Sequence, residues 1–311
     1  MTASTDQPMT PEQTANLEQA AAPGQSRIDL DRDLDGKVRE LADAVAAQLT
    51  GIRRLGVAYS GGVDSATLLA LAVRALGREN VVALLGVSPS LARREHRRAH
   101  ATAAAIGAQV VEIATHEGEN PAYVANDVDR CYHCKVELFT RIDDRLTRDL
   151  QLAAVAYGEN ADDAERIDRP GAQAATEHAV LRPLAAAGMT KQQVRTVARA
   201  LELPVADKPA APCLASRIPH GHAVTPRKLE QVDALEDAVL GAGFTDCRVR
   251  HHGEIARIEV PTDQLARAVE PEVRAALTAA GREAGFDHVV LDLDGISSGR
   301  FTLQILNARG R

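Results

Sequence analysis

The residues best suited to chemistry form the short run YSGGVDS. Gly61 and Gly62 carry no Cβ, so the backbone of this turn can approach a ligand closely. The free N–H groups of the turn and of a following helix would converge on one spot, which favours a polyanion. Ser60 and Ser65 can donate hydroxyl hydrogen bonds to phosphate oxygens. Asp64 alone would repel phosphates, so we expect it to face a Mg²⁺ ion that accompanies them.

The flanking residues place this run between a strand and a helix. Leu55, Val57 and Tyr59 alternate as in a short strand, and apolar residues at helical spacing follow Ser65. The run resembles the SGGxDS signature of the PP-loop pyrophosphatases, which split ATP into AMP and pyrophosphate. No lysine follows the second glycine, so this is not the GK[ST] type of P-loop. The alternative is an ordinary Gly-Gly turn, which a six-residue match in this context disfavours.

Two cysteines, Cys131 and Cys134, stand three residues apart at the start of an amphipathic pattern that predicts a helix. One face of the first helical turn would present both sulfur atoms. A helix N-terminus favours thiolate, as do the neighbouring charges of Arg130 and Lys135. A CxxC pair can be a redox pair, but no thioredoxin-like pattern surrounds this one.

A third cysteine, Cys213, lies in a segment punctuated by prolines. Four cysteines in a chain of this size, without export, favour metal or catalytic roles over disulfides. Zinc would need a fourth ligand, which Cys247 or His133 could supply. Cys247 stands in a predicted strand, where a small buried residue is the simpler interpretation. Alternatively, three thiolates would leave one iron of a 4Fe-4S cluster open to an exogenous sulfur.

Strands alternate with helices in the first two thirds of the chain. We expect strands over 81–87, 109–113 and 153–157, and helices over 35–49 and 91–106. This alternation predicts an α/β fold with a parallel sheet, in which ligands bind beyond the carboxyl ends of the strands.

The loop after the last of these strands carries Asn160, Asp162 and Asp163 at that edge of the sheet. These side chains could orient a nucleotide or a metal, or they could cap the next helix. We include Asn160 in the expected ATP site, together with the glycine turn.

The domain organisation follows from changes in composition. Residues 1–28 are rich in small and polar types, which predicts a disordered tail. The range 29–205 is assigned to an ATP-binding domain, and 206–311 to a smaller α+β domain for substrate and sulfur transfer. In that second domain we expect a helix over 226–240, followed by a hairpin around Gly253 and a last strand near the C-terminus.

Composition and charge exclude several functional classes. The net charge of −7 argues against broad nucleic-acid binding, and aromatic residues, at 3%, offer few platforms for stacking bases. No apolar run is long enough to span a membrane, and the N-terminus lacks the pattern of a secretory signal. We therefore expect a cytoplasmic enzyme with a small-molecule substrate.

From about Leu41 onward the chain resembles the LarE family. These proteins are PP-loop, ATP-dependent sulfur transferases that build the thiocarboxylates of the nickel-pincer nucleotide, the cofactor of lactate racemase. The resemblance rests on six segments in this order: YSGGVDSATLL, RCYHCK, GENADD, KPAAPCLASRIPHG, CRVRHHGEIARIEV and VVLDLDGISSG. It implies an adenine nucleotide alpha hydrolase-like fold with ATP and Mg²⁺ as cofactors, and a homo-oligomer.

The resemblance also implies a reaction. ATP adenylates a pyridinium carboxylate and releases pyrophosphate, and a sulfur nucleophile then displaces AMP to leave a thiocarboxylate. One branch of the family sacrifices the sulfur of a single cysteine, the counterpart of Cys213, and another uses three cysteines to hold a 4Fe-4S cluster that relays added sulfide. Because Cys131 and Cys134 are also present, we predict the cluster branch, with a separate source of sulfide.

Four basic residues are candidates to grip the substrate phosphate and carboxylates. A guanidinium fork matches both groups, and in a strand Arg248 and Arg250 would face the same side. Each could instead be a surface residue. A nearby glutamate, Glu236, could bind a metal or pair with an arginine. The full set of substrate-binding candidates is Lys208, Arg217, Arg248 and Arg250.

Two other functions remain open from the sequence. A PP-loop tRNA thiolase would also combine ATP with cysteines, but it needs a basic surface for RNA, which the net charge of −7 does not suggest. A nucleotide-binding sensor with a structural zinc ion would not be an enzyme, and the CxxC pair beside a PP-loop disfavours it.

Overall fold

The structure is a computed structural model that describes residues 27–142, 144–164 and 170–296. The chain divides into two compact units, each of which takes three segments of the sequence. Among the described residues, unit 1 comprises those up to Gly86, Arg97–Ala114 and Leu138–Ala210. Unit 2 comprises Val87–His96, Thr115–Glu137 and the residues from Ala211 onward.

Unit 1 is built on a four-stranded sheet with the strand order β3-β2-β1-β4. Its strands are β1 (Leu55–Ala58), β2 (Val81–Val87), β3 (Gln109–Ala114) and β4 (Ala154–Tyr157). Strand β1 pairs in parallel with both β2 and β4, and all four of its residues are buried. A strand buried on both faces is expected in a parallel sheet covered by helices, and this confirms the predicted α/β fold.

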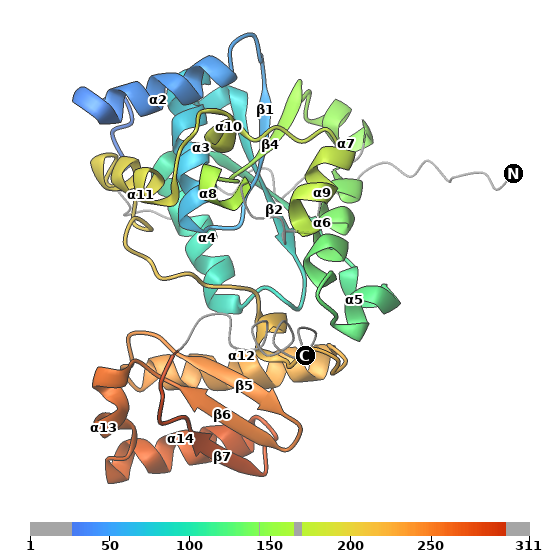
Figure 1. Cartoon of the computed structure of the whole chain (residues 1–311), viewed down its shortest axis with the longest axis vertical. Coiled ribbons are helices and arrows are strands. Elements are labelled where there is room, and N and C mark those ends of the chain that lie inside the picture. Colours follow the sequence, from blue (N-terminus) through green and yellow to red (C-terminus); the bar gives the residue numbers. More distant parts are fainter. Residues whose placement is uncertain (1–26, 143, 165–169, 297–311) are drawn as a thin grey trace, which may run out of the picture. The chain divides into compact units, whose positions relative to one another are not determined.

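Helices α2, α3 and α11 of this unit lie side by side (Figure 1). Helix α3 (Val63–Leu76) is buried along most of its length, because Leu, Val and Ala occupy nearly every position after its first turn. The other helices that lie wholly or partly in unit 1 are α2 (Gly36–Gln48), α4 (Arg93–Ile106), α6 (Arg130–Arg141), α7 (Asp144–Asp149), α8 (Ala161–Ala164), α9 (Pro170–Glu177), α10 (Pro183–Ala186), α11 (Lys191–Ala200) and the 3-10 helix η2 (Arg78–Asn80).

Unit 2 contains a second, three-stranded sheet with the order β5-β6-β7. Strands β5 (Arg248–His252) and β6 (Ile255–Glu259) are antiparallel, and β7 (His288–Leu291) runs parallel to β6. The turn between β5 and β6 holds Gly253 at φ +68°, as the predicted hairpin requires. The helices of this unit are η3 (Glu117–Glu119), α5 (Pro121–Ala125), η4 (Leu214–Arg217), α12 (Pro226–Gly241), η5 (Thr262–Gln264), α13 (Leu265–Ala268) and α14 (Pro271–Glu283).

The core of unit 2 joins residues that are distant in the sequence. Val249, Ala256 and Ile258 face helix α12 and pack with Ala92 and Tyr123 in one buried apolar cluster. The segments around Ala92 and Tyr123 therefore belong to the same compact body as the C-terminal sheet. The expected boundary after 205 lies near the change of unit at 210, but a single cut cannot represent this interleaving.

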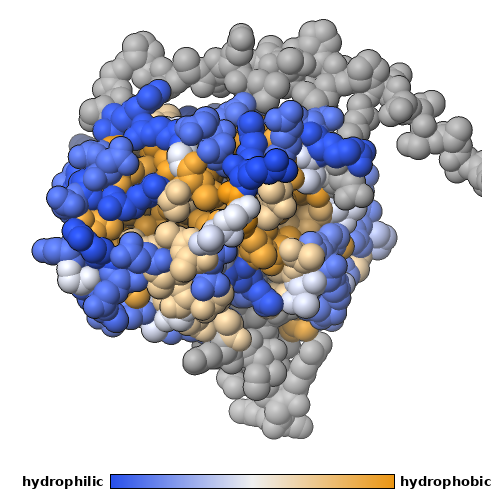
Figure 2. Space-filling view, turned by 90° about the horizontal axis from the view of Figure 1, so that it is seen from above, coloured by the Kyte–Doolittle hydropathy of each residue, from blue (hydrophilic) through white to orange (hydrophobic). Residues whose placement is uncertain are grey.

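The predicted disordered tail falls almost wholly on residues 1–26, which lie outside the described part of the chain. Within the described part, no helix is both long enough and apolar enough to cross a bilayer. The face shown in Figure 2 carries hydrophilic residues around a band of apolar ones.

Candidate functional site

The glycine turn of unit 1 has the backbone geometry of an anion cradle. Gly61 adopts φ +68°, and a Cβ there would stand 2.8 Å from the Cβ of Ala99. Gly62 is the N-cap of helix α3. The hydroxyls brace the turn: Ser60 N donates to Ser65 Oγ at 3.2 Å, and Ser65 Oγ donates to the carbonyl of Gly62 at 3.1 Å. The turn thus lies at the positive end of a buried helix, the end that favours an anion.

Asp64, in the first turn of α3, contacts the loop that follows β4. Asn160 is fully buried and donates its side-chain N–H to Asp64 Oδ1 at 3.3 Å. The same amide caps helix α8, because Asn160 Oδ1 accepts from the backbone N–H of Asp163 at 3.0 Å. The two roles that the sequence left open for Asn160 are therefore compatible. Its place beside Asp64 makes it a candidate to orient Mg²⁺ and nucleotide.

A lysine that the sequence analysis did not single out completes this site. Lys191 forms an ion pair with Asp64, and its backbone N–H donates to Asp162 Oδ2 at 2.8 Å. Lys191 is the first residue of α11, where Thr190 and Gln193 form a capping box. The T-x-x-Q pattern of that box was the signal in the sequence that could have revealed the helix start.

Lys208, predicted to bind the substrate, lies beside the same turn. Its Nζ donates to the carbonyl oxygen of Gly61 at 3.2 Å. Arg195 holds the segment by donating to the carbonyl of Lys208 at 3.0 Å. Two lysines, Lys191 and Lys208, thus flank the predicted phosphate cradle within unit 1.

The three predicted cysteines all belong to unit 2. Cys131 and Cys134 stand on α6, and Cys213 precedes η4. Cys131 and Cys213 are exposed, and Cys134 is half-buried. Desolvation raises the pKa of the Cys134 thiol, and the charges of Glu117, Cys213 and Cys131 raise it further. The thiols are therefore close enough to influence each other electrostatically.

Cys213 is coupled to the same group. Although the residue is exposed, the atoms packed around its sulfur raise the pKa of its thiol by desolvation; Arg130 opposes this rise and Cys131 adds to it. Cys247 differs, because it is fully buried in the core and its Sγ donates to the carbonyl of Glu236 at 3.5 Å. This supports the simpler interpretation of Cys247 as a small buried residue.

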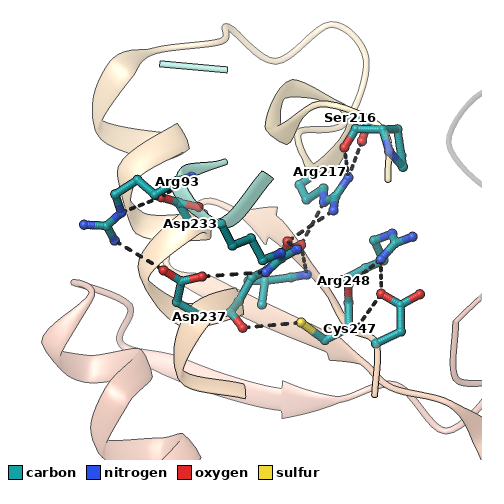
Figure 3. Close-up of polar contacts among 12 residues, drawn as sticks. Arg93, Ser216, Arg217, Asp233, Asp237, Cys247 and Arg248 are labelled. Carbon is teal, nitrogen blue, oxygen red and sulfur yellow. Dashed lines mark hydrogen bonds and ion pairs between the residues drawn. The ribbon is translucent and has the colours of Figure 1, made fainter. Parts of the chain in front are cut away.

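Arg217 shapes the turn that carries Cys213. Only 1% of its surface is exposed, and its guanidinium donates to the carbonyl of Pro212 at 2.7 Å and to Ser216 Oγ at 2.8 Å. Its Nε also donates to Glu236 Oε1 at 2.8 Å. Figure 3 shows this network between the turn and the elements beneath it. These contacts give Arg217 a structural role in this turn, separate from its predicted role in binding a substrate.

The two strand arginines are also buried and ion-paired. Arg250 donates from Nη2 to Glu259 at 2.9 Å and from Nη1 to the carbonyl of Ser216 at 3.1 Å. Arg248 pairs with Asp246 at 2.5 Å. The expected common face of β5 holds, since both alternate with the core residue Val249. Their role toward a substrate remains a prediction.

Asn126 is a further residue that the sequence analysis missed. It is fully buried in a left-handed conformation (φ +59°), and its amide donates to the carbonyls of Ile218 at 3.2 Å, Pro219 at 2.9 Å and His222 at 3.0 Å. Asn tolerates this conformation better than most residues. The amide thereby fastens the loop after Cys213 to the segment that leads into α6.

Comparisons with known proteins match parts of this chain or most of it. The family model for asparagine synthase matches residues 38–135, which include the glycine turn. The pyridinium-3,5-bisthiocarboxylic acid mononucleotide synthase of Lactiplantibacillus plantarum is 32% identical over 271 residues, covering 85% of this chain and 95% of its own length.

Two other relatives differ in how much of this chain they match. An uncharacterized protein of Synechocystis sp. is 41% identical over 244 residues, covering 78% of this chain and 90% of its own length. The NH(3)-dependent NAD(+) synthetase of Methanopyrus kandleri is 46% identical, but over 59 residues only, which is 18% of this chain and 21% of its own. The first kind of match extends over both units, whereas the second is local.

Proposed function

This chain belongs to the LarE family of pyridinium-3,5-bisthiocarboxylic acid mononucleotide synthases, and on that premise we propose that it is an ATP-dependent sulfur transferase. It adenylates a carboxylate of a pyridinium nucleotide and converts that carboxylate into a thiocarboxylate. The PP-loop of unit 1 activates the acid, and the cysteines of unit 2 deliver the sulfur.

The first step is activation of the carboxylate. A carboxylate oxygen attacks the α-phosphorus of ATP, and pyrophosphate leaves with the electron pair of the broken P–O bond. The N–H groups of the glycine turn, Lys191 and Lys208 stabilise the charge that develops on the phosphate oxygens. Asp64 and Asn160 would hold a Mg²⁺ ion, which would offset charge on the phosphates. The ion pair between Lys191 and Asp64 supports this arrangement, because it puts both charges at one place.

The second step delivers sulfur. A sulfur nucleophile attacks the carbonyl carbon of the acyl adenylate, and AMP leaves with the electron pair of the C–O bond. We assign Cys131, Cys134 and Cys213 as the ligands of a 4Fe-4S cluster. When bound by three cysteines, such a cluster keeps one iron open, where an exogenous sulfide can bind.

The donor set fits a cluster better than a single zinc ion. Thiolates at about 2.3 Å around one tetrahedral zinc lie only roughly 3.8 Å apart. Among the described residues, no group of three ligand atoms within 4.8 Å of one another includes these cysteines. All three cysteines lie in unit 2, and the charges of the other cysteines raise the pKa values of the Cys134 and Cys213 thiols. A polynuclear group, whose thiolate ligands stand farther apart than those of one zinc ion, would suit such a set.

The LarE relationship, together with the placement of these three thiols from two distant segments in one unit, is the observation that supports the sulfur-transfer proposal. The test is anaerobic reconstitution with iron and sulfide, followed by reaction with ATP and the pyridinium dicarboxylate mononucleotide. We expect AMP, pyrophosphate and thiocarboxylate in more than one turnover when sulfide is supplied. Cys213→Ser should abolish thiocarboxylate but keep pyrophosphate release, whereas the matched variant Cys247→Ser should keep both.

Two results would overturn parts of this proposal. A single turnover that leaves dehydroalanine at position 213, seen by mass spectrometry of the intact chain, would show that Cys213 gives up its own sulfur. Thiocarboxylate formation by Cys131→Ser at the wild-type rate would show that the CxxC pair takes no part.

A further inference from the structure

A buried arginine beside the cysteines, Arg130, lacks the carboxylate partner that other buried arginines of unit 2 have. Arg130, the first residue of α6, exposes only 6% of its surface. Its Nη1 donates to Asn126 Oδ1 at 2.5 Å and to the carbonyl of Ala215 at 3.0 Å, and both acceptors are neutral. Among the residues that the structure describes, no carboxylate forms an ion pair with it.

The other buried arginines of unit 2 set the contrast. Arg94 and Arg217 both pair with Glu236, and Arg250 pairs with Glu259. Arginine stays protonated in proteins, so it cannot escape the cost of burial by losing its proton. A buried charge without an opposite charge is strongly unfavourable. Arg130 therefore calls for an anion that the carboxylates of this unit do not supply.

Arg130 lies beside the sulfur atoms of the site. It directly precedes Cys131 in α6 and donates to the carbonyl of Ala215, two residues after Cys213. A side-chain hydrogen bond also links it to Cys131. Glu117 is held by Ser88 Oγ and Ser90 Oγ, which donate to it at 2.5 and 2.8 Å. Its charge acts on Cys134.

The guanidinium is also held firmly in place. Asn126 presents Oδ1 to Arg130 because its amide N–H groups are committed to three backbone carbonyls of the loop after Cys213. Two of the five N–H donors of the guanidinium are accounted for by Asn126 and Ala215. The other donors are not used by these two contacts, and a side-chain hydrogen bond joins Arg130 to Cys131.

We propose that Arg130 is the anion-binding residue of the three-cysteine site, and that the anion it binds is sulfur: the thiolates of Cys131 and Cys213 together with a hydrosulfide-class donor. This inference rests on the proposed function, because it concerns the charge of the same site. It assigns to Arg130 the task of keeping negatively charged sulfur next to the CxxC helix.

The test compares Arg130→Gln, Arg130→Lys and the control Arg93→Gln with the wild-type chain. Arg93 is mostly exposed, so its variant makes the same change of charge without touching the cysteines. Each protein is reconstituted anaerobically with iron and sulfide. The measurements are iron and sulfide content, resistance of the bound iron to a chelator, the reduction potential, and the melting temperatures of the metal-free and loaded forms.

Arg130→Gln should melt no lower than wild type when metal-free, because it removes an uncompensated buried charge. Loaded, it should lose its iron at roughly 10-fold to 100-fold lower chelator concentration, and its reduction potential should become more negative. Arg130→Lys should keep the wild-type potential, and Arg93→Gln should keep the wild-type iron content, resistance to chelator and potential. The inference is overturned if Arg130→Gln melts lower in both forms alike and keeps the wild-type potential, since Arg130 would then only hold the loop.

Failure of the cluster assignment would look different, because wild type itself would take up no iron. The inference would then be decided with sodium hydrosulfide alone on the metal-free proteins. A rise in melting temperature in wild type that Arg130→Gln lacks would support it. An equal response of both proteins would refute it.

Discussion

At the scale of single residues, Glu236 has the largest consequences in unit 2. It is fully buried, and it accepts from Arg217, from Arg94 at 2.6 Å and from the backbone N–H of Val249 at 3.0 Å. Burial alone would raise the pKa of Glu236, but Arg217 and Arg94 outweigh it and hold the pKa below its ordinary value. One carboxylate thus joins the Cys213 turn, helix α4 and the C-terminal sheet.

Replacing Glu236 by Gln should therefore destabilise the protein strongly. Two buried guanidinium groups would lose their counter-charge, and breaking a buried pair costs about 3–5 kcal/mol. Urea unfolding measures the change in free energy. The matched variant Asp237→Asn removes a half-exposed carboxylate that lies 3.9 Å or more from its arginines. It should cost less than about 1 kcal/mol, and an equal loss in both variants would contradict the argument.

The protein should become less stable as the pH falls, because of His251. Desolvation lowers the pKa of this buried histidine to about 4, whereas in the unfolded chain it is about 6.5. A depressed folded-state pKa gives stability that is present above pH 6.5 and is lost as the pH falls toward 4. We expect His251→Phe to flatten the dependence of the unfolding free energy on pH in this window, and the exposed His288→Gln to leave it unchanged. If His251→Phe keeps the wild-type dependence of the unfolding free energy on pH, other groups cause that dependence.

At the scale of elements, the ATP site depends on helices α3 and α11 beginning side by side. Helix α3 presents the glycine turn and Asp64. The capping box of α11 fixes the start of that helix at Lys191. Gly158, after β4, approaches α3 so closely that a Cβ would lie 2.7 Å from the backbone N of Ser65. Three chain segments thus meet through backbone contacts that only small residues allow.

Lys191→Met should lower kcat/KM for pyrophosphate release by about 10-fold to 100-fold. A hydrogen bond to a charged group contributes about 1.5–3 kcal/mol, and Met keeps the length of the side chain without its charge. A pyrophosphate-release assay with varied ATP measures the effect. Thr190→Ala, which removes the helix cap and keeps the lysine, should cost about 1 kcal/mol of stability and little activity. If Lys191→Met leaves the kinetics unchanged, Lys191 takes no part in the ATP site.

Gly61→Ala tests the backbone of the cradle. The substitution puts a Cβ at φ +68°, 2.8 Å from the Cβ of Ala99, and a left-handed residue with a Cβ costs roughly 1–2 kcal/mol. We expect loss of ATP-dependent pyrophosphate release with a folded chain, checked by circular dichroism. Gly51→Ala, also at positive φ but in open space, should share the strain and keep the activity.

At the scale of the whole molecule, the interleaving of the two units decides which parts can fold alone. Unit 2 takes Arg94 and Tyr123 from segments that lie between the segments of unit 1 in the sequence. A fragment of residues 206–311 would lack Arg94, one of the two arginine partners of Glu236, and part of the apolar core. We expect this fragment to show no cooperative urea transition, whereas the full chain should. A sharp transition in the fragment would contradict the interleaving.

The local pattern of the chain predicted most elements and the glycine turn. The strand 81–87, the helix starting at Pro226 and the hairpin around Gly253 were readable because hydrophobic period and turn residues are local properties. The helix at Lys191 was overlooked despite its capping box. The sequence left Glu236 either to bind a metal or to pair with an arginine. Its pairing with Arg217 in particular could not be predicted, because partner choice between residues 19 positions apart depends on packing.

By itself, the sequence determined the PP-loop, the parallel α/β fold and the presence of three cysteines suited to bind a metal, since motif and periodicity are written in neighbouring residues. Only the tertiary structure decided that Cys131, Cys134 and Cys213 share one unit, that Asp64 meets Lys191, and that Arg130 is buried without a carboxylate. Burial and charge balance depend on which distant segments pack together, and no short stretch of sequence contains that information.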